Sequence, residues 1–503
     1  MKVIRNIHII LILALTTRIA SGEGELLRLC QVFLQGQTTF SSEELNKRAG
    51  WNGSNTFSDA VIEAGIDRIL GSYEDSGYPY CQIMVDSLST ESPDQLRLFL
   101  RISEGPLVKV NNVEFTGVSA GVAHSLLKEL RFESGEKFSA SVWQERMRVL
   151  KNLEYIKSAT GPDLKLDFLT GTATVSIQLE ETNSSLSGGL GYVPARGTQS
   201  GYLAGNLSLN FSNLLGGPRQ ANLVWNKKDL NSYYLNFGYT EQWLFNTPLS
   251  FRLDFKQSQT DSSYSQISVE QQTSYRLGRH LTVASLLGGE RIFQKGNLKN
   301  VFPSSRKIGL GFKLSFNHTD SRLNPRQGWD FFAQTKFFNW KKSDTLATAQ
   351  TKNEDRIVEN QFGLSKFIPT WESQALAVKL SYARVISRKG SLSPAELFKI
   401  GGTGTLRGHL QEQYWADRVF LTSLEYRFLL TEQGRFYLFT DMAHMAQNFF
   451  QNGDLVSEPG FRLGYGLGFW LTSRVGLVGL DLGLGQADQL NDLKVHLSVQ
   501  NRF

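Results

Sequence analysis

Short segments in which apolar and polar residues alternate fill the sequence from about residue 186 onward, and they restrict the possible fold more than any other feature. In the segment 249–255, for example, Leu, Phe, Leu and Phe are separated by Ser, Arg and Asp. Because the side chains of a strand point alternately to its two faces, each segment predicts a strand with one apolar and one polar face. About sixteen such segments begin near residues 186, 201, 219, 231, 248, 263, 279, 306, 328, 355, 373, 418, 434, 460, 475 and 492.

An even number of strands of about ten residues, apolar on one face and polar on the other, is typical of an outer-membrane β-barrel. A soluble β-sandwich also alternates, but it rarely contains so many strands in succession and needs no charged interior. Closing the sheet into a barrel removes the exposed edge strands that lipid does not tolerate. The sequence therefore predicts a mainly β protein, with a 16-stranded antiparallel transmembrane β-barrel over residues 184–503.

The N-terminus has the features of a secretory signal peptide. Lys2 and Arg5 precede an apolar run over Ile7–Leu15, and small residues follow at Ala20 and Gly22. The run is too short for a transmembrane helix, which needs about 20 residues. We therefore expect a signal peptide over residues 1–22. A buried N-terminal helix is the alternative.

Residues 23–104 and 105–183 repeat one order of predicted elements, namely strand, helix, helix, strand and strand. Each unit is expected to pack a helix face on a three-stranded sheet, whose exposed edge can accept another strand. A spacer without any binding role is the alternative. The expected strands are 29–34, 80–88, 95–102, 108–115, 164–168 and 173–179. One expected helix begins at Ser41, and the three others span 57–73, 120–130 and 140–153.

Composition and motifs exclude several classes of function. The net charge of +6 is spread along the chain without a basic arm, so no nucleic-acid partner is expected. Two cysteines are too few for a disulfide scaffold or a Cys-rich metal site. The sequence contains no nucleophile elbow, zinc-protease motif, EF-hand or Walker loop. We therefore predict a protein that is not an enzyme and that has no cofactor and no metal site.

Residues 392–409 resemble the sixth extracellular loop of the BamA/TamA-type outer-membrane assembly and translocation superfamily. The hallmark of that loop is Arg-Gly followed by an aromatic residue. Arg407 and Gly408 match it, whereas His409 stands where the family has Tyr or Phe. The loop lies between two predicted strands, as the family requires.

Other segments extend the resemblance to nearly the whole mature chain. The two repeated units resemble POTRA domains, and the turns at 213–217 and 320–328 resemble turns of the family. Residues 439–443 are similar to a Phe-x-Asp-x-Gly strand, with Ala443 in place of the glycine. The last residue, Phe503, is also typical of such barrels.

The loop is expected to fold into the barrel and to bring Arg407 into the lumen, where a guanidinium needs a carboxylate partner. The resemblance implies Asp441 as that partner, and Phe439 lies on the same strand face. Alternation along the neighbouring strand points Glu425 inward as a second choice. Alternatively, the pair only anchors the loop and has no role in transport. The predicted turning residues of the loop are Gly401, Gly402, Gly404 and Gly408, followed by His409.

The resemblance also implies a weak seam between the first and last strands of the barrel. Gly188, Gly189 and Gly191 lie in the first strand, and glycines weaken strand pairing. The last strand spans residues 493–503 and ends at Phe503. We hypothesise that this seam is a lateral gate. Alternatively, the glycines only ease closure of the barrel.

The resemblance implies a factor that assembles and inserts outer-membrane proteins, with its barrel in the outer membrane and its POTRA-like domains in the periplasm. Its expected partners are unfolded outer-membrane or secreted polypeptides, periplasmic chaperones or accessory lipoproteins, and outer-membrane lipid. The alternatives are a two-partner-secretion-type transporter, whose client passes through the lumen, and a passive porin-like channel. In the POTRA arrangement Cys30 and Cys81 lie too far apart for a disulfide, so two buried thiols are expected.

Overall fold

The computed structural model of the chain forms two compact units. The signal peptide predicted over residues 1–22 and the terminal Phe503 lie outside the described residues. No helix within the described ranges is both long enough and apolar enough to cross a membrane. The structure describes residues 28–51, 55–56, 59–92, 95–167, 170, 172–182, 184–194, 201–227, 229–260, 264–294, 304–342, 354–388, 392, 396–431, 433–451, 454–473 and 476–500.

The first small sheet has the strand order β2-β1-β4-β3, in which β1 runs parallel to β4. The predicted order of strands and helices is confirmed, but a two-residue strand, β2, makes the sheet four-stranded rather than three-stranded. Helix α1 begins after Ser41, whose hydroxyl accepts a hydrogen bond from the backbone N–H of Glu44. The elements are β1 (Arg28–Gln35), α1 (Ser42–Ala49), β2 (Asn55–Thr56), α2 (Asp59–Asp75), β3 (Gln82–Ser92) and β4 (Gln95–Ser103).

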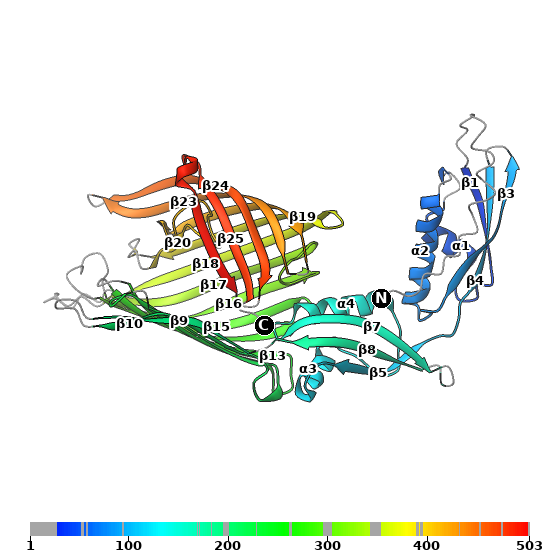
Figure 1. Ribbon diagram of the computed structural model, residues 1–503, viewed down its shortest axis with the longest axis horizontal. Helices are drawn as coiled ribbons and strands as arrows, with labels where there is room; N and C mark the ends of the chain where they lie inside the picture. Colours follow the sequence, from blue (N-terminus) through cyan, green and yellow to red (C-terminus); the bar gives the residue numbers. More distant parts are fainter. Residues whose placement is uncertain are drawn as a thin grey trace. The chain divides into compact units, whose positions relative to one another are not determined.

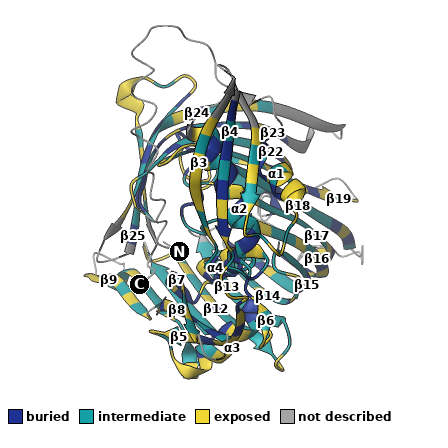
Figure 2. Ribbon diagram, turned by 90° about the vertical axis from the view of Figure 1, so that its right-hand side faces the viewer, coloured by how far each residue is buried: buried dark blue, intermediate teal, exposed yellow. Residues whose placement is uncertain are grey.

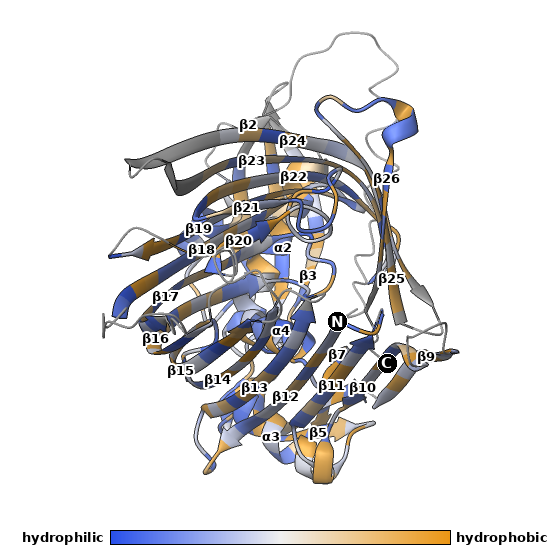
Figure 3. Cartoon of the chain, turned by 90° about the vertical axis from the view of Figure 1, so that its left-hand side faces the viewer, coloured by the Kyte–Doolittle hydropathy of each residue, from blue (hydrophilic) through white to orange (hydrophobic). Residues whose placement is uncertain are grey.

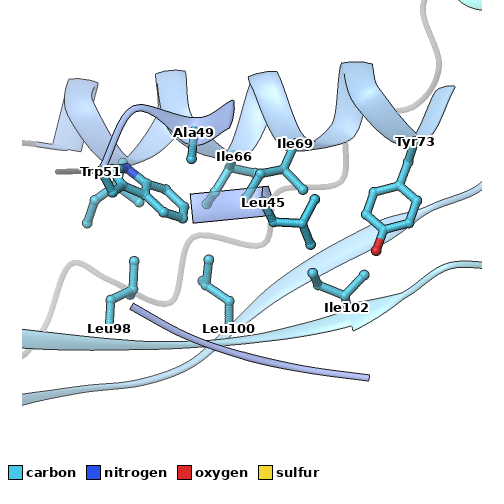
Figure 4. Packing of buried hydrophobic residues seen from close by; sticks show 10 residues of the cluster. Leu45, Ala49, Trp51, Ile66, Ile69, Tyr73, Leu98, Leu100 and Ile102 are labelled. Atoms are coloured by element: carbon cyan, nitrogen blue, oxygen red, sulfur yellow. The ribbon is translucent and has the colours of Figure 1, made fainter. Parts of the chain in front are cut away.

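One apolar core joins the two helices of this sheet to its inner strand. Leu45 of α1 and Ile69 of α2 are fully buried and pack toward Leu98 and Leu100 of β4 (Figure 4). Fully burying such a side chain stabilises a fold by about 1.5–3 kcal/mol. By contrast, β3 at the edge of the sheet is mostly exposed (Figure 2). The sheet therefore has one well-buried strand and one accessible edge.

Cys81 lies just before β3 as a half-buried free thiol, and burial raises its pKa to about 12. The side chain of Cys30, on β1, lies outside the described residues. Strand β4 separates β1 from β3, as the POTRA-like arrangement requires.

The second small sheet repeats this architecture with the order β6-β5-β8-β7 and β5 parallel to β8. It also has a fourth, two-residue strand, β6. Strand β7 begins well before the predicted strand 164–168. The prediction missed its first part because the buried residues there recur every third position rather than every second. The elements are β5 (Lys109–Thr116), α3 (Ala120–Leu130), β6 (Glu136–Lys137), α4 (Ala140–Asn152), β7 (Ile156–Asp167) and β8 (Thr172–Glu181).

The large sheet contains sixteen antiparallel strands, coloured from green to red in Figure 1. Consecutive strands pair throughout, except that β19 pairs with β22 because β20 and β21 form a hairpin in the connection between them. Its strands are β9 (Ser185–Val193), β10 (Tyr202–Phe211), β11 (Arg219–Lys227), β12 (Tyr233–Leu244), β13 (Leu249–Thr260), β14 (Tyr264–Leu277), β15 (Leu281–Gln294), β16 (Ser305–Thr319), β17 (Gly328–Lys342), β18 (Glu354–Trp371), β19 (Gln374–Ser387), β22 (Arg418–Leu429), β23 (Arg435–Gln451), β24 (Asp454–Ser473), β25 (Gly476–Gly485) and β26 (Lys494–Gln500).

The two faces of this sheet differ as the alternation predicted. On β16 the side chain of Phe312 is 61% exposed, whereas that of Lys307 is 8% exposed and is paired with Glu290 and Glu359. Apolar and polar bands accordingly follow one another along the strands (Figure 3). An apolar outer face with charges turned inward is the pattern of a barrel surrounded by lipid.

Candidate functional site: the loop tip inside the barrel

The connection from β19 to β22 turns back on itself through the hairpin of β20 (Phe398–Ile400) and β21 (Tyr414–Ala416). Its tip contains the four predicted glycines, and all four have a positive φ. At Gly408 the need for glycine is twofold. Its φ is 83°, and a Cβ would lie 2.4 Å from the carbonyl oxygen of Leu484.

Arg407 and Asp441 lie in direct contact. The Nε and Nη2 atoms of Arg407 donate to the two carboxylate oxygens of Asp441 at 2.7 Å each. The backbone N–H of Arg407 donates to the same carboxylate at 3.0 Å. Asp441 is 1% exposed and Arg407 is 7% exposed. This bidentate pairing requires the planar guanidinium of arginine, and the single ammonium group of a lysine cannot form it.

Glu425 and Phe439 complete the surroundings of Arg407. The Nη1 atom of Arg407 lies 3.0 Å from Glu425 Oε1, and Nη2 donates to Ser423 Oγ at 3.0 Å. The guanidinium carbon lies 3.9 Å from the centre of the Phe439 ring, which is a cation–π contact. The structure thus brings together Arg407, Asp441, Glu425 and Phe439 from the loop, β22 and β23.

The ion pairs continue beyond Arg407. Glu425 is also bound by Lys379 at 3.1 Å and by Arg427 at 2.5 Å, and Asp481 lies 3.9 Å from Arg407. Burying charges is costly unless each is paired, and this set contains three basic and three acidic groups. We call it the luminal charge cluster, and its members are Lys379, Arg407, Glu425, Arg427, Asp441 and Asp481.

Two glycines of the barrel wall make room for the tip, and sequence reasoning missed both. A Cβ at Gly464 of β24 would lie 1.8 Å from the carbonyl oxygen of Arg407. A Cβ at Gly483 of β25 would lie 2.7 Å from the backbone nitrogen of Gly408. The backbone of the tip therefore lies directly on the backbones of β24 and β25.

The stem of the loop is held by apolar packing. Ile400, Leu406 and Ala416 are buried in one cluster with Val419 and Ala443 of the wall. Closer to β19, Leu397 packs in a second cluster that contains Trp340. Beside it, the buried Glu396 accepts a hydrogen bond from Trp340 Nε1 at 2.5 Å. The loop is thus attached to the wall at its tip, its hairpin and its base.

The predicted seam residues lie apart from this cluster. Gly188, Gly189 and Gly191 are on β9 and pair with Leu207, Asn206 and Ala204 of β10. Strand β26 pairs with β25, and no backbone pairing joins β9 to β26 among the described residues. The predicted seam residue Phe503 lies outside those residues.

The sequence of residues 213–503 matches the Omp85 superfamily domain. The chain belongs to the Omp85 superfamily. A protein of Treponema pallidum, named "Putative outer membrane protein assembly factor", is 20% identical over 324 residues, which are 62% of this chain and 35% of that protein. The chain thus spans about a third of the length of that curated relative.

Two solved structures resemble the chain over nearly its whole length. The first is BamA from Haemophilus ducreyi lacking POTRA domains 1–3, with a TM-score of 0.51 and 16% identity. The match covers 95% of this chain and 100% of the Haemophilus ducreyi chain. CdiB from Escherichia coli has a TM-score of 0.49 at 14% identity, over 96% of this chain and 92% of that chain. The likeness to the Haemophilus ducreyi structure shows the fold and extends across the small sheets and the large one.

Membership in the Omp85 superfamily confirms the resemblance that the loop and turn motifs indicated. The sixteen-stranded sheet of this Omp85 protein matches a BamA barrel, and its two small α+β sheets are like POTRA domains. By family and fold it is an outer-membrane β-barrel protein. The roles of Arg407 and its neighbours belong to the proposals below.

Proposed function

We propose that this Omp85 protein is a non-enzymatic factor that assembles other outer-membrane proteins. Its POTRA-like domains receive unfolded polypeptides in the periplasm, and its barrel aids their insertion through the seam between β9 and β26. Folding of the client supplies the free energy. Periplasmic chaperones or accessory lipoproteins deliver clients, and outer-membrane lipid receives them.

The observation that carries this proposal is the firm seating of the loop. A client that crosses the lumen requires the loop to leave the barrel, which breaks the contacts of Arg407 with Asp441 and Glu425. Leaving also exposes Ile400 and Leu406 to water, at about 1.5–3 kcal/mol for each side chain. The charged contacts add to this cost because Asp441 then stays buried without its partner. A client route along the seam leaves all these contacts intact.

The two end strands of the sheet favour such a route. Strand β9 carries three glycines, and its apolar residues Leu186 and Leu190 are largely exposed. Glycine contributes no side chain to cross-strand packing. An end strand that has no neighbouring strand on one side within the described residues can pair with a client strand. We therefore propose that β9 and β26 form the lateral gate.

The small sheets support capture of unfolded clients. Among the described residues, strand β3 pairs with β4 and lies at an edge of its sheet, and β7 has the same place in the second sheet. An extended peptide can add to such an edge through backbone hydrogen bonds, with little demand on its sequence. Tolerance of sequence is what a factor with many clients requires.

Depletion of the protein in its native cell tests this proposal against the two alternatives. We expect the abundance of many outer-membrane barrel proteins to fall, as measured by quantitative proteomics of the membrane fraction. Loss of a single secreted protein, with the barrel proteins unchanged, would instead indicate a two-partner-secretion transporter. A change in solute permeability alone would indicate a passive channel.

A further inference from the structure

His409 occupies the position at which the resemblance predicts Tyr or Phe, and both of its ring nitrogens have partners. Nε2 lies 3.0 Å from the carbonyl oxygen of Leu463 on β24, and Nδ1 lies 3.1 Å from the hydroxyl of Tyr414 on β21. A carbonyl oxygen can only accept, so Nε2 carries a hydrogen. A second hydrogen bond joins Nδ1 to the Tyr414 hydroxyl. We propose that His409, which carries a hydrogen on Nε2, is a positioning residue that fixes the loop tip to the C-terminal strands of the barrel.

The place of Leu463 in the sheet explains what the imidazole contributes. The pairing of β24 with β25 ends at Gly464 and Gly485, so Leu463 lies one residue beyond the last pair. His409 supplies a hydrogen bond to β24 where that ladder stops. The ring is nearly buried, and a Cβ at Gly485 would lie 3.0 Å from its Cε1 atom. The imidazole therefore fills a gap at the end of β25 that only a glycine leaves open.

The same segment of the tip also lies against β25. Arg407 lies on Gly464 of β24, Gly408 lies on Leu484 of β25, and the His409 ring lies beside Gly485 at the end of β25. His409 thus continues the contact of the tip with β24 and β25. Release of the tip therefore removes an attachment of these two strands.

A phenylalanine would keep the ring but lose both hydrogen bonds. The carbonyl of Leu463 and the hydroxyl of Tyr414, which both belong to partly buried residues, would then lose these partners, which is unfavourable. The choice of histidine is therefore specific to this loop, in which Tyr414 stands five residues further along the same hairpin. The side chain of His409 thus links β21 to β24 through two hydrogen bonds.

The test uses the full-length protein in lipid nanodiscs without any client. Cys30 and Cys81 are replaced by alanine, and Thr403→Cys places one thiol on the loop tip. The rate at which a water-soluble maleimide modifies this thiol reports how often the tip leaves its seat. The variants are His409→Phe, His409→Gln, His409→Asn and Tyr414→Phe. The matched control is His444→Phe, which changes an exposed histidine of β23.

We expect a rate increase of about 5-fold for each hydrogen bond removed. Gln can still reach Leu463 and Asn can still reach Tyr414, so each should give about 5-fold, whereas Phe should give about 25-fold. Tyr414→Phe should match the Gln variant, and the control should leave the rate unchanged. All variants are first checked for a folded barrel by their heat-dependent migration on gels.

The hydrogen on Nε2 gives a second readout that a space-filling role would not determine. The ¹⁵N chemical shifts of the His409 ring, assigned by comparison with the Gln variant, should show a protonated Nε2. A bare Nε2, or a Phe variant with the rate of the parent, would overturn the proposal. Because this role rests on the proposed seating of the loop and needs no client, a failed assembly function would leave both results unaffected.

Discussion

At the scale of single residues, Asp441 is the carboxylate on which the loop tip depends most. It accepts three hydrogen bonds from Arg407, whereas Glu425 shares its oxygens with Lys379 and Arg427. We predict that Asp441→Asn destabilises the barrel by about 3–5 kcal/mol, because it leaves a buried guanidinium without its main partner. Denaturant titration of the folded barrel in detergent, followed by gel migration, measures this loss.

The control for this change is Glu412→Gln. Glu412 pairs with Lys399 at 3.1 Å, but its side chain is half exposed, and such pairs contribute about 0–1 kcal/mol. Arg407→Lys should fall between the two, since it keeps the charge and loses the two-pronged geometry. Equal stabilities for Asp441→Asn and Glu412→Gln would contradict the central place given to Asp441.

Glu104 makes the first small sheet sensitive to acid. Burial tends to raise its pKa, but hydrogen bonds from the hydroxyls and backbone N–H groups of Thr38 and Thr39 lower the pKa to about 2. Since the unfolded pKa is about 4.3, the ionised carboxylate stabilises this sheet above that pH, and the contribution is lost as the pH falls toward 2.

We therefore predict that Glu104→Gln removes this pH dependence. The test is hydrogen exchange of the amides of Thr38 and Thr39 in the full chain, measured from pH 6 to pH 2.5. After correction for the intrinsic pH dependence of exchange, the protection of these amides should fall on acidification in the parent only. Glu63→Gln, on the exposed side of α2, is the control and should behave as the parent. An equal acid response in the parent and in Glu104→Gln would disprove the assigned role.

The sequence indicated some of these residues and not others, for physical reasons. Arg407 and Asp441 stand in segments that resemble motifs of the superfamily, and this resemblance implied their pairing without coordinates. Lys379 lies on a strand that is distant in sequence, and only the register of the sheet brings it to Glu425. Asp481 left a signal that could have been used, because it is the sole acidic residue of the Gly- and Leu-rich β25.

At the scale of elements, the contact between the loop tip and β24 depends on Gly464, which has no side chain. We predict that Gly464→Ala displaces the tip, because its Cβ would collide with the backbone of Arg407. The matched control on the same strand is Gly460→Ala, where the nearest atoms belong to the flexible side chain of Arg462 at 3.6 Å or more.

Maleimide modification of a cysteine at Thr403 measures this displacement as well. We expect a faster rate for Gly464→Ala and the parental rate for Gly460→Ala. The two variants should also differ in stability, since the first must move backbone and the second need not. The same rate in both variants would mean that the tip does not rest on β24.

Period-two alternation placed the starts of fifteen of the sixteen barrel strands to within two residues, because each strand has one face in contact with the interior and one turned outward. It placed the start of β24 near residue 460, six residues after its actual start at Asp454. It missed most of β7, whose buried positions begin with a spacing of three. It also missed β2 and β6, since two residues carry no period. The hairpin of β20 and β21 escaped for another reason, namely that its three-residue strands pack against the wall rather than form part of it.

At the scale of the whole chain, the attachments of the large sheet are unevenly distributed. Buried ion pairs and apolar packing hold the loop against β22, β23 and their neighbours, whereas the ends at β9 and β26 carry no mutual backbone pairing within the described part of the sheet. We therefore expect the sheet to open first at its seam. In our proposal the loop is a fixed inner support and the seam is the moving part.

Two disulfide-locked forms of the full chain provide the most direct test of this division. One lock joins β21 to β23, which are in contact, and the other joins β9 to β26. Both are reconstituted in liposomes, and the folding rate of an unfolded barrel client is measured before and after reduction. We predict that the loop lock leaves client insertion unchanged and that the seam lock abolishes it until the disulfide is reduced. Normal insertion through a locked seam, with loss of insertion on locking the loop, would contradict the account.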